Sequence, residues 1–148
     1  MTEGLDTRQL EQLARDLETV ADLYPDRAKE FLKNQANKTR NRLRANTKAA
    51  TTKRTGNLIK GIRRGSVQVR DGDYQVRVFN KAPHAHLIEH GHVQWVPVKG
   101  YGSGHRRKTE QFVPGRHPAA RTVKEMKQSM AADAGGLVDE VLKRGGLG

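Results

Sequence analysis

The sequence predicts an α+β protein, with a small antiparallel sheet flanked by N-terminal and C-terminal helices and a long loop arm. Three observations predict this class. Apolar residues recur at helical spacing in residues 1–46 and again in residues 118–148. Between these segments, alternating apolar and polar residues surround Asp71-Gly72, which is the pattern of a β-hairpin. A glycine-rich basic stretch at residues 97–111 then separates two further apolar runs, as expected of an arm.

Length and composition are those of one domain with a thin core. The chain has 148 residues, of which only 34% are hydrophobic and 5% aromatic, so we expect exposed arms or burial completed in an oligomer. It has no cysteine, which excludes disulfides and thiolate metal sites. Because the chain shows no signal-peptide pattern and no apolar run of membrane length, we expect a soluble intracellular protein.

We divide this single domain, residues 1–148, into four parts. They are N-terminal helices (1–46), a flexible basic connector (47–56), a sheet core that includes the arm 97–111 (57–117), and a C-terminal helix and tail (118–148).

Charge is unevenly spread along the chain. Residues 1–26 hold two basic and seven acidic residues, a net charge of −5, whereas residues 27–64 hold thirteen basic residues against one acidic residue, a net charge of +12. Such a contrast favours pairing between the two segments or docking of the basic block onto an acidic partner. A solvated helix face is the plainer interpretation of the same charges.

The first 46 residues carry two helical stripes. Asp6 and Gln9 form a capping box before the first stripe. Pro25 suits either the end of that helix or the first turn of the next. We expect the second helix to fray near Asn41 and Asn46. The residues of the first stripe are Leu10, Leu13, Leu17, Val20 and Tyr24.

The sheet core begins with a short helical turn and a hairpin. With Asp71-Gly72 as a two-residue loop, Val69 pairs with Tyr74 and Val67 with Val76. This register predicts one buried and one solvent-facing side. The residues predicted to face the core are Val67, Val69, Tyr74, Val76 and Val78.

After the hairpin we expect a short helix, two paired strands and a last helix. Residues 84–90 form about two helical turns that end at Gly91. Residues 93–98 form a strand that pairs with residues 112–113, and residues 99–111 between them have no structure of their own. The last helix starts at Pro118 and breaks or kinks at Gly135-Gly136. Its predicted inward residues are Val123, Met126 and Met130.

The spacing His86-x-x-Glu89-His90 is that of the inverted zinc peptidases. On a helix, His86 and His90 share one face and can bind one Zn²⁺, with Glu89 as general base on the bound water. No companion motif supplies a third ligand, although three residues are candidates for it. A small zinc-dependent hydrolase is therefore one alternative function. The third-ligand candidates are Glu110, His117 and Glu125.

A basic DNA-associated protein is the other alternative. Lysine and arginine at the density of residues 27–64 suit phosphates, but Phe31 is the only aromatic residue there for stacking on bases. The sequence has no cysteine and no Gly-x-Ser-x-Gly motif for nucleophilic catalysis. No glycine-rich, phosphate-binding loop follows a predicted strand. The candidate contacts in this block are Arg40, Arg42, Arg44, Lys53 and Arg54.

Three motifs occur in a recognisable order. A Thr-Gly-x-Leu turn precedes the hairpin, an Ile-Glu-x-Gly-His motif follows it, and a Pro-Ala start opens the last helix. This order resembles the neck or tail-completion proteins of long-tailed bacteriophages, the family also labelled tail-component, minor capsid or head–tail joining protein. The motif residues are Thr55, Gly56, Leu58, Ile88, Glu89, Gly91, His92, Pro118 and Ala119.

The resemblance implies a non-enzymatic structural protein of the virion, with no catalytic residue, metal or cofactor. It implies a ring, hexameric or dodecameric, at the head–tail interface, assembled in the host cytoplasm and not at a membrane. The ring would join the head connector to the tail, with packaged DNA passing through its lumen. The arm would reach a neighbouring subunit or the lumen, and its basic residues would face a partner or DNA. Those residues are Arg106, Arg107 and Lys108.

The resemblance also assigns structural roles to the motif. Gly91 permits a turn with positive φ between helix and strand. Glu89 accepts hydrogen bonds from backbone N–H groups of the loop or pairs with Arg116. His117-Pro118 sets the start of the last helix.

Overall fold

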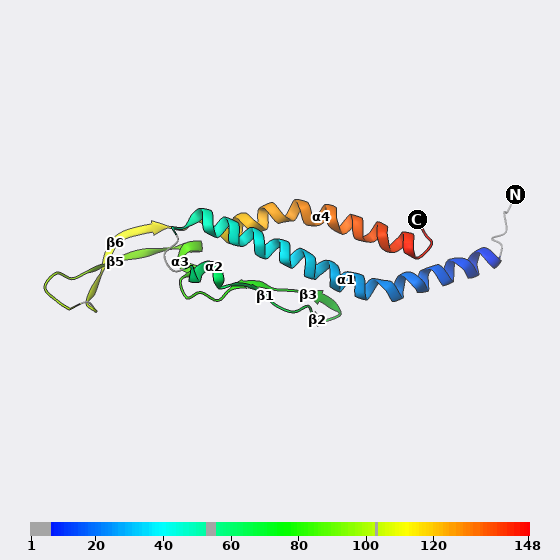
Figure 1. The fold of residues 1–148 in the computed structure, drawn as a ribbon, viewed down its shortest axis with the longest axis horizontal. Helices are drawn as coiled ribbons and strands as arrows, with labels where there is room; N and C mark the ends of the chain where they lie inside the picture. The colour runs from blue at the N-terminus through cyan, green and yellow to red at the C-terminus, as the bar shows by residue number, and fades with distance from the viewer. Residues whose placement is uncertain (1–6, 53–55, 103) are drawn as a thin grey trace.

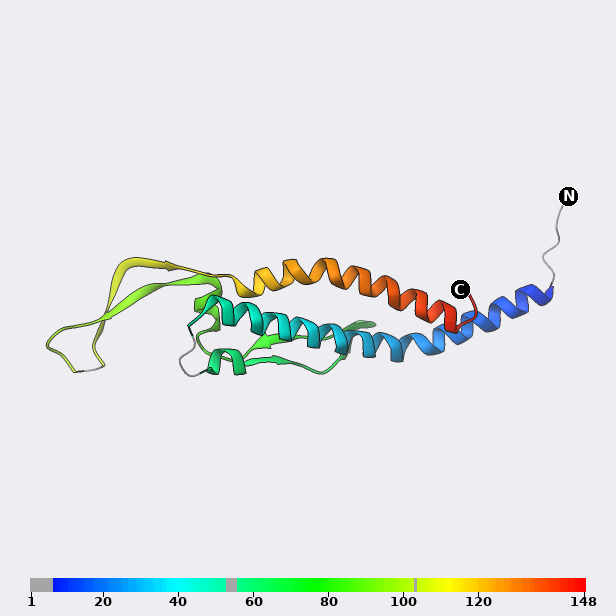
Figure 2. The same cartoon turned by 45° about the horizontal axis from the view of Figure 1, so that its top comes forward.

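The computed structural model describes residues 7–52, 56–102 and 104–148. Two long antiparallel helices, α1 (Thr7–Ala50) and α4 (Pro118–Arg144), run side by side, and the other elements are attached to them (Figures 1 and 2). The predicted α+β class is confirmed. The remaining elements are α2 (Asn57–Lys60), β1 (Ile62–Arg64), β2 (Gln68–Arg70), β3 (Asp73–Gln75), β4 (Val78–Asn80), α3 (Ala85–His90), β5 (Gly91–Pro97) and β6 (Arg106–Pro114).

The N-terminal region is a single helix, so the prediction of two helices separated at Pro25 is wrong. Pro25 lies inside α1, where its ring removes one backbone hydrogen bond and costs about 3 kcal/mol. In Figure 1 the N-terminal part of α1 runs in a different direction from the rest, as expected of a helix bent near a proline.

The predicted fraying at Asn46 is also wrong. Asn46 and Thr47 are buried, with 8% and 2% of their surfaces exposed, because α4 packs over them. The helix continues to Ala50, which removes residues 47–50 from the predicted connector. Lys53, Arg54 and Thr55 lie outside the described residues.

The contact between α1 and α4 is partly polar. The side chains buried along this seam include alanines, threonines and amides as well as Met126 and Val141. The predicted inward position of Met126 is confirmed at 9% exposure, whereas Val123 at 56% and Met130 at 37% are exposed. The buried residues of the described chain are Ala28, Gln35, Ala36, Asn46, Thr47, Ile62, Pro118, Thr122, Met126, Val141 and Gly145.

The predicted break in the last helix is wrong. Helix α4 passes through Gly135 and Gly136 without interruption. Their side of α4 is open, with no atom within 4 Å of a Cβ placed at either glycine. The glycines therefore weaken α4 without breaking it, because Val141 beyond them is buried and fastens the last turns.

Residues 62–80 form a hairpin around Asp71-Gly72 as predicted, but its strands pair in two separate stretches, and the predicted pair of Val67 with Val76 falls in the interruption between them. Asp71 and Gly72 have φ of 53° and 84°, and Val69 pairs with Tyr74 as expected of a two-residue turn with positive φ at both positions. Strands β1 and β4 lengthen the hairpin, with one residue more on the first side, which makes a bulge before β2. Val69 is 63% exposed, so its predicted burial is wrong. At the tip of the hairpin, β3 is the strand that packs against α1, where Lys29 lies over the ring of Tyr74.

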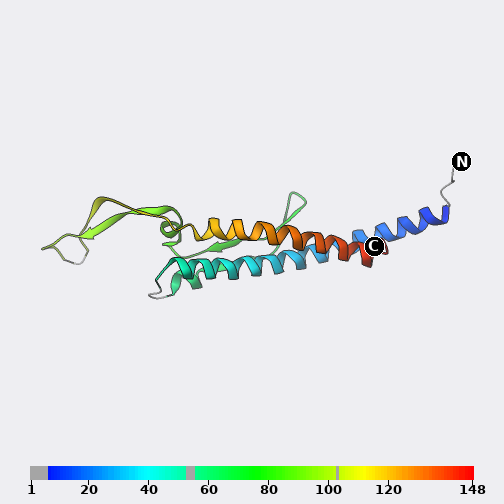
Figure 3. The ribbon, with the colours of Figure 1, turned by 90° about the horizontal axis from the view of Figure 1, so that it is seen from above.

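The arm is a two-stranded β-ribbon. Strand β6 starts at Arg106 and pairs with β5, so residues 106–111 are strand and not the structureless loop predicted. The register shifts between Val93 and Trp95, where Gln94 faces the extra residues of β6 and its carbonyl accepts a hydrogen bond from Thr109 Oγ1 at 2.8 Å. The ribbon extends past the end of the helix pair (Figure 3).

No helix within the described ranges is long and apolar enough to cross a membrane.

We expect Gly135→Ala to stabilise the protein by about 1 kcal/mol, because alanine is the better helix former and the site is open. Gly72→Ala is the matched control, since its surroundings are equally open but its φ is +84°. We expect that control to destabilise. Urea denaturation of both variants measures the difference, and equal midpoints would contradict the expectation.

Candidate functional site

Five of the motif residues meet around one cavity of about 260 Å³. They come from three separate elements: Leu58 from α2, Ile88 and Glu89 from α3, and Pro118 and Ala119 from α4. Helix α1 and strand β4 close the remaining walls. The motif therefore marks the junction at which the hairpin side of the molecule joins the helix pair. The other lining residues are Leu43, Thr47, Val78, Phe79, Asn80, Ala85 and His86.

Glu89 caps helix α4 from outside that helix. Its Oε2 accepts a hydrogen bond from the backbone N–H of Ala119 at 2.8 Å, and its Oε1 accepts one from Ala120 at 3.0 Å. These N–H groups belong to the first turn, where a helix has no internal acceptors. His117, at the N-cap position, makes no side-chain cap, so the carboxylate of Glu89 satisfies both donors and also complements the positive end of the helix dipole.

Gly91 and Gly115 let the chain pass closely beside this cap. Gly91 ends α3 with φ of 84°, which confirms the predicted turn between helix and strand. A Cβ at Gly91 would lie 2.5 Å from the carbonyl oxygen of Val113, and one at Gly115 would overlap the carbonyl of Glu89. The backbone N–H of Arg116 donates to Ile88 O at 2.8 Å. A side chain at either glycine would push α3 away from the start of α4.

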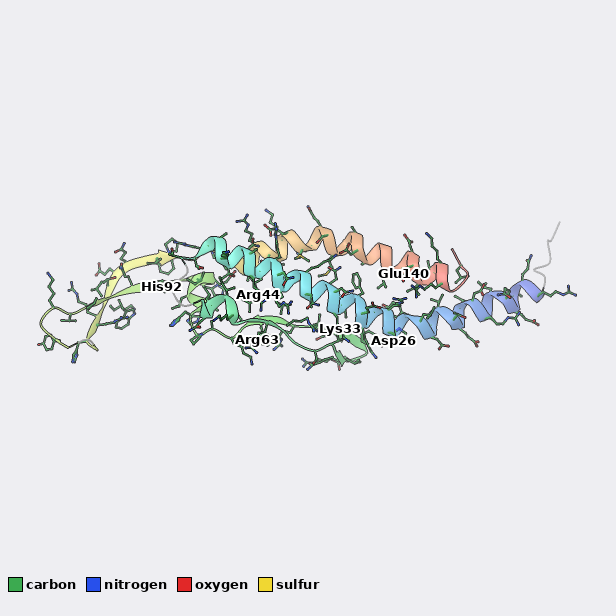
Figure 4. The ribbon with its side chains drawn as sticks, in the orientation of Figure 1. Asp26, Lys33, Arg44, Arg63, His92 and Glu140 are labelled. Carbon is green, nitrogen blue, oxygen red and sulfur yellow. The ribbon has the colours of Figure 1, made fainter. Side chains whose placement is uncertain are left out.

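The remaining motif residues surround this junction. Gly56 starts α2 with φ of 75° and its carbonyl accepts a hydrogen bond from Lys60 N–H at 3.0 Å. Asn80 Nδ2 donates to Leu58 O at 3.1 Å, which ties α2 to β4. His92 lies at the base of the ribbon (Figure 4), where its Nδ1 is buried and has no hydrogen-bond partner among the described residues. Thr55 lies outside them.

The histidine motif does not form a metal site in the described part of the chain. No group of three or more metal-ligating side chains gathers there. His86 and His90 are both exposed, while the carboxylate of Glu89 is engaged by the first turn of α4. Of the candidate third ligands, Glu125 pairs with Arg42 and Arg121 instead. The spacing His-x-x-Glu-His here arises from a short helix whose glutamate serves as a cap.

Several basic residues of α1 form ion pairs within the molecule. Arg42 Nε lies 2.5 Å from Glu125 Oε2, Lys38 pairs with Asp133 at 2.8 Å, and Arg27 with Glu140 at 3.5 Å. The side chain of Glu140 lies between α4 and α1 (Figure 4). The predicted pairing of the basic block with the acidic N-terminal segment is therefore wrong for these three residues. Their acidic partners are on α4, which runs antiparallel along the block.

The other two basic candidates of α1 differ in their use. Arg44 Nη2 donates to Ile62 O at 2.9 Å, which joins α1 to the most buried residue of β1. Arg40 donates only to Asn41 Oδ1, at 3.4 Å, among the interactions described for it. In the ribbon, Arg106, Arg107 and Lys108 are all exposed on β6. Arg116 donates to Ala50 O and does not pair with Glu89.

The sequence alone does not identify the amide and hydroxyl groups that are buried between α1 and α4. Asn46 Nδ2 donates to Thr122 Oγ1 at 2.9 Å and to Glu125 Oε2 at 3.0 Å. Gln35 Nε2 donates to Asp133 Oδ2 at 2.6 Å. The usable signal is the spacing Gln35, Thr39, Asn46, which places polar residues within the apolar stripe of α1.

The seam shifts the ionisation of two carboxyl groups. Hydrogen bonds from Arg42, and next from Asn46, lower the pKa of Glu125 from 4.5 to about 2. Lys38, and next Gln35, lower the pKa of Asp133. Both groups therefore stabilise the folded state in their ionised forms.

The motif residues thus hold three separate elements together at one junction. A family profile described as "Bacteriophage HK97-gp10, putative tail-component" matches residues 11–91, more than half of the chain. The chain therefore belongs to this family and is a phage tail component. The family is one of structural proteins and not of enzymes. Neither a curated protein nor a solved structure gives a significant match.

We expect Glu89→Ala to destabilise the protein by about 1–2 kcal/mol, because two N–H groups of α4 lose their acceptor. Glu110→Ala, which removes an exposed carboxylate of β6, is the control and is expected to be neutral. Thermal unfolding followed by circular dichroism measures both. Equal melting temperatures for Glu89→Ala and Glu110→Ala would contradict the capping role.

Acid is expected to weaken the seam through Glu125. Its folded pKa is depressed, so its contribution is present above pH 4.5 and is lost as pH falls toward about 2. We expect Glu125→Gln to unfold at a temperature that falls less over this interval than that of the wild type. Asp139→Asn, at an exposed position of α4, is the control. Parallel acid profiles for Glu125→Gln and the wild type would refute the linkage.

Proposed function

We propose that this tail component is a ring-forming subunit of the head-to-tail interface, of the neck, tail-completion or terminator class, that joins the head connector to the tail. One observation carries the proposal: large apolar side chains are exposed at both ends of the elongated subunit. Leu17 on α1 is 52% exposed, and Trp95 on the ribbon is 55% exposed. A protein with so few buried apolar residues gains by covering such surfaces in an assembly.

The extended shape supports the same role. The helix pair forms the body, and the ribbon and the N-terminal part of α1 leave it in opposite directions (Figure 1). Each subunit thereby reaches beyond its own body on two sides. In this proposal the partners are further copies of the chain and the neighbouring connector and tail proteins, and its place is in the virion. The net charge of +12 suits a lumen through which DNA passes.

Electron microscopy of phage particles tests this function. A phage that lacks the gene is expected to yield DNA-filled heads and separate tails, because the joint between them is missing. Wild-type protein supplied from a plasmid is expected to restore joined particles. Absence of the protein from purified virions would refute the proposal.

A further inference from the structure

The N-terminal part of α1 carries an apolar stripe that the described chain leaves uncovered. Three leucines follow one another at helical spacing and are 44–52% exposed. Helix α4 ends at Arg144, and Gly145 lies against Val20, so the preceding turns of α1 extend beyond the helix pair (Figure 2). We call these residues the N-terminal stripe: Leu10, Leu13 and Leu17.

The ribbon has an apolar and basic face that is equally uncovered. Side chains alternate between the two faces of a strand, and directly paired residues share a face. Because Val93 pairs with Phe112 and Trp95 with Lys108, these four lie on one face, together with Arg106, which pairs with Pro97. Trp95 and Phe112 are 55% and 57% exposed. We call this the ribbon face: Val93, Trp95, Arg106, Lys108 and Phe112.

A two-stranded ribbon of this kind needs a cover. Such hairpins are marginally stable in water unless a third strand or a helix packs against them. Helix α3 contacts β5 near the base of the ribbon. Beyond that base no other element lies beside the ribbon in any view (Figures 1, 2 and 3).

The two uncovered surfaces are complementary in charge. Residues 7–26 hold two arginines and five carboxylates, a net charge of −3. Residues 91–114 hold four basic residues and one carboxylate, a net charge of +3. An acidic helix with an apolar stripe thus matches a basic ribbon with an apolar face, in both the charged and the apolar part of the contact.

We propose that the N-terminal stripe of one subunit packs across the ribbon face of a second copy of this chain. The two surfaces lie at opposite ends of the subunit, so they cannot meet within one chain (Figure 3). A contact between unlike surfaces is head-to-tail and continues from subunit to subunit, closing into a ring when the rotation permits. The inference rests on the proposed function and specifies the surfaces that form the ring.

DNA is the competing occupant of the ribbon face. Its phosphates would satisfy Arg106 and Lys108, but they would leave the N-terminal stripe exposed. A second copy covers both surfaces with one contact, and this favours the subunit over DNA.

A complementation experiment distinguishes a head-to-tail contact from other modes. The stripe variant is Leu13→Asp with Leu17→Asp, and the ribbon variant is Trp95→Asp with Phe112→Asp. All four side chains are about half exposed, so both variants are expected to fold, which circular dichroism checks. The matched control is Val123→Asp with Val138→Asp, at 56% and 51% exposure on α4.

Each variant alone is expected to be monomeric, with self-association weakened about tenfold or more, because central apolar residues dominate such contacts. An equal mixture is expected to form a 1:1 dimer, since one intact stripe and one intact ribbon remain. Native mass spectrometry measures these states, and the control is expected to assemble as the wild type does. A mixture that stays monomeric, or either variant that assembles like the wild type, would overturn the proposal.

A cross-linking experiment tests the same contact if the purified wild-type protein is monomeric. The chain has no cysteine, so Leu13→Cys with Trp95→Cys introduces the only thiols. Mild oxidation during particle assembly is expected to give a ladder of disulfide-linked subunits, and Val123→Cys with Val138→Cys is expected to give none. Absence of the ladder in particles that contain the protein would overturn this contact but not the proposed function, whereas virions without the protein would refute the function itself.

A final measurement addresses DNA. Labelled duplex DNA is titrated with the wild type and with the ribbon variant at physiological salt. Loss of DNA binding in the ribbon variant, with its self-association unchanged, would assign the ribbon face to nucleic acid and overturn the proposal.

Discussion

Asn46 of α1 and Thr122 of α4 meet in a buried hydrogen bond where the two long helices run antiparallel, and the other elements depend on this pairing. The side chains buried along the seam include alanines, threonines and amides. Gln35, Lys38, Arg42 and Asn46 of α1 each contact a polar side chain of α4, and these contacts specify the observed register of the two helices. Exposed ion pairs of this kind add only about 1 kcal/mol or less each, so they specify more than they stabilise.

The cap made by Glu89 connects this helix pair to the rest of the molecule. It belongs to α3, after the hairpin, yet it satisfies the first turn of α4. Gly91 and Gly115 allow the two chain segments to lie close enough for that contact. The family match ends at Gly91, while the N–H groups that receive the cap lie beyond it. The His-x-x-Glu-His spacing is typical of a metal site, but in this structure its glutamate connects the part of the chain that matches the family to the part that does not.

The described core contains few large apolar side chains, while several lie exposed at the ends of the subunit. Among the larger apolar residues that the structure describes, only Ile62, Met126 and Val141 are buried. Because the described fold buries so little apolar surface, further burial requires contact with other molecules. The elongated shape and the exposed ends thus have a common cause, the low apolar content of the chain.

The sequence by itself determined the helices at both ends, the hairpin turn at Asp71-Gly72, the stop at Gly91 and the family. Each depends on neighbours close in sequence: helical spacing, two residues that accept positive φ, or a short ordered motif. Tertiary structure decided the rest. Pro25 and Gly135-Gly136 do not end their helices, because packing of α1 on α4 outweighs the local preference. Strand β6 starts at Arg106 because β5 supplies its hydrogen bonds. Above all, the sequence offered backbone N–H groups as one possible partner of Glu89 but could not say which ones, since the N–H groups it caps lie thirty residues away in the sequence and only the fold brings them within 3.0 Å.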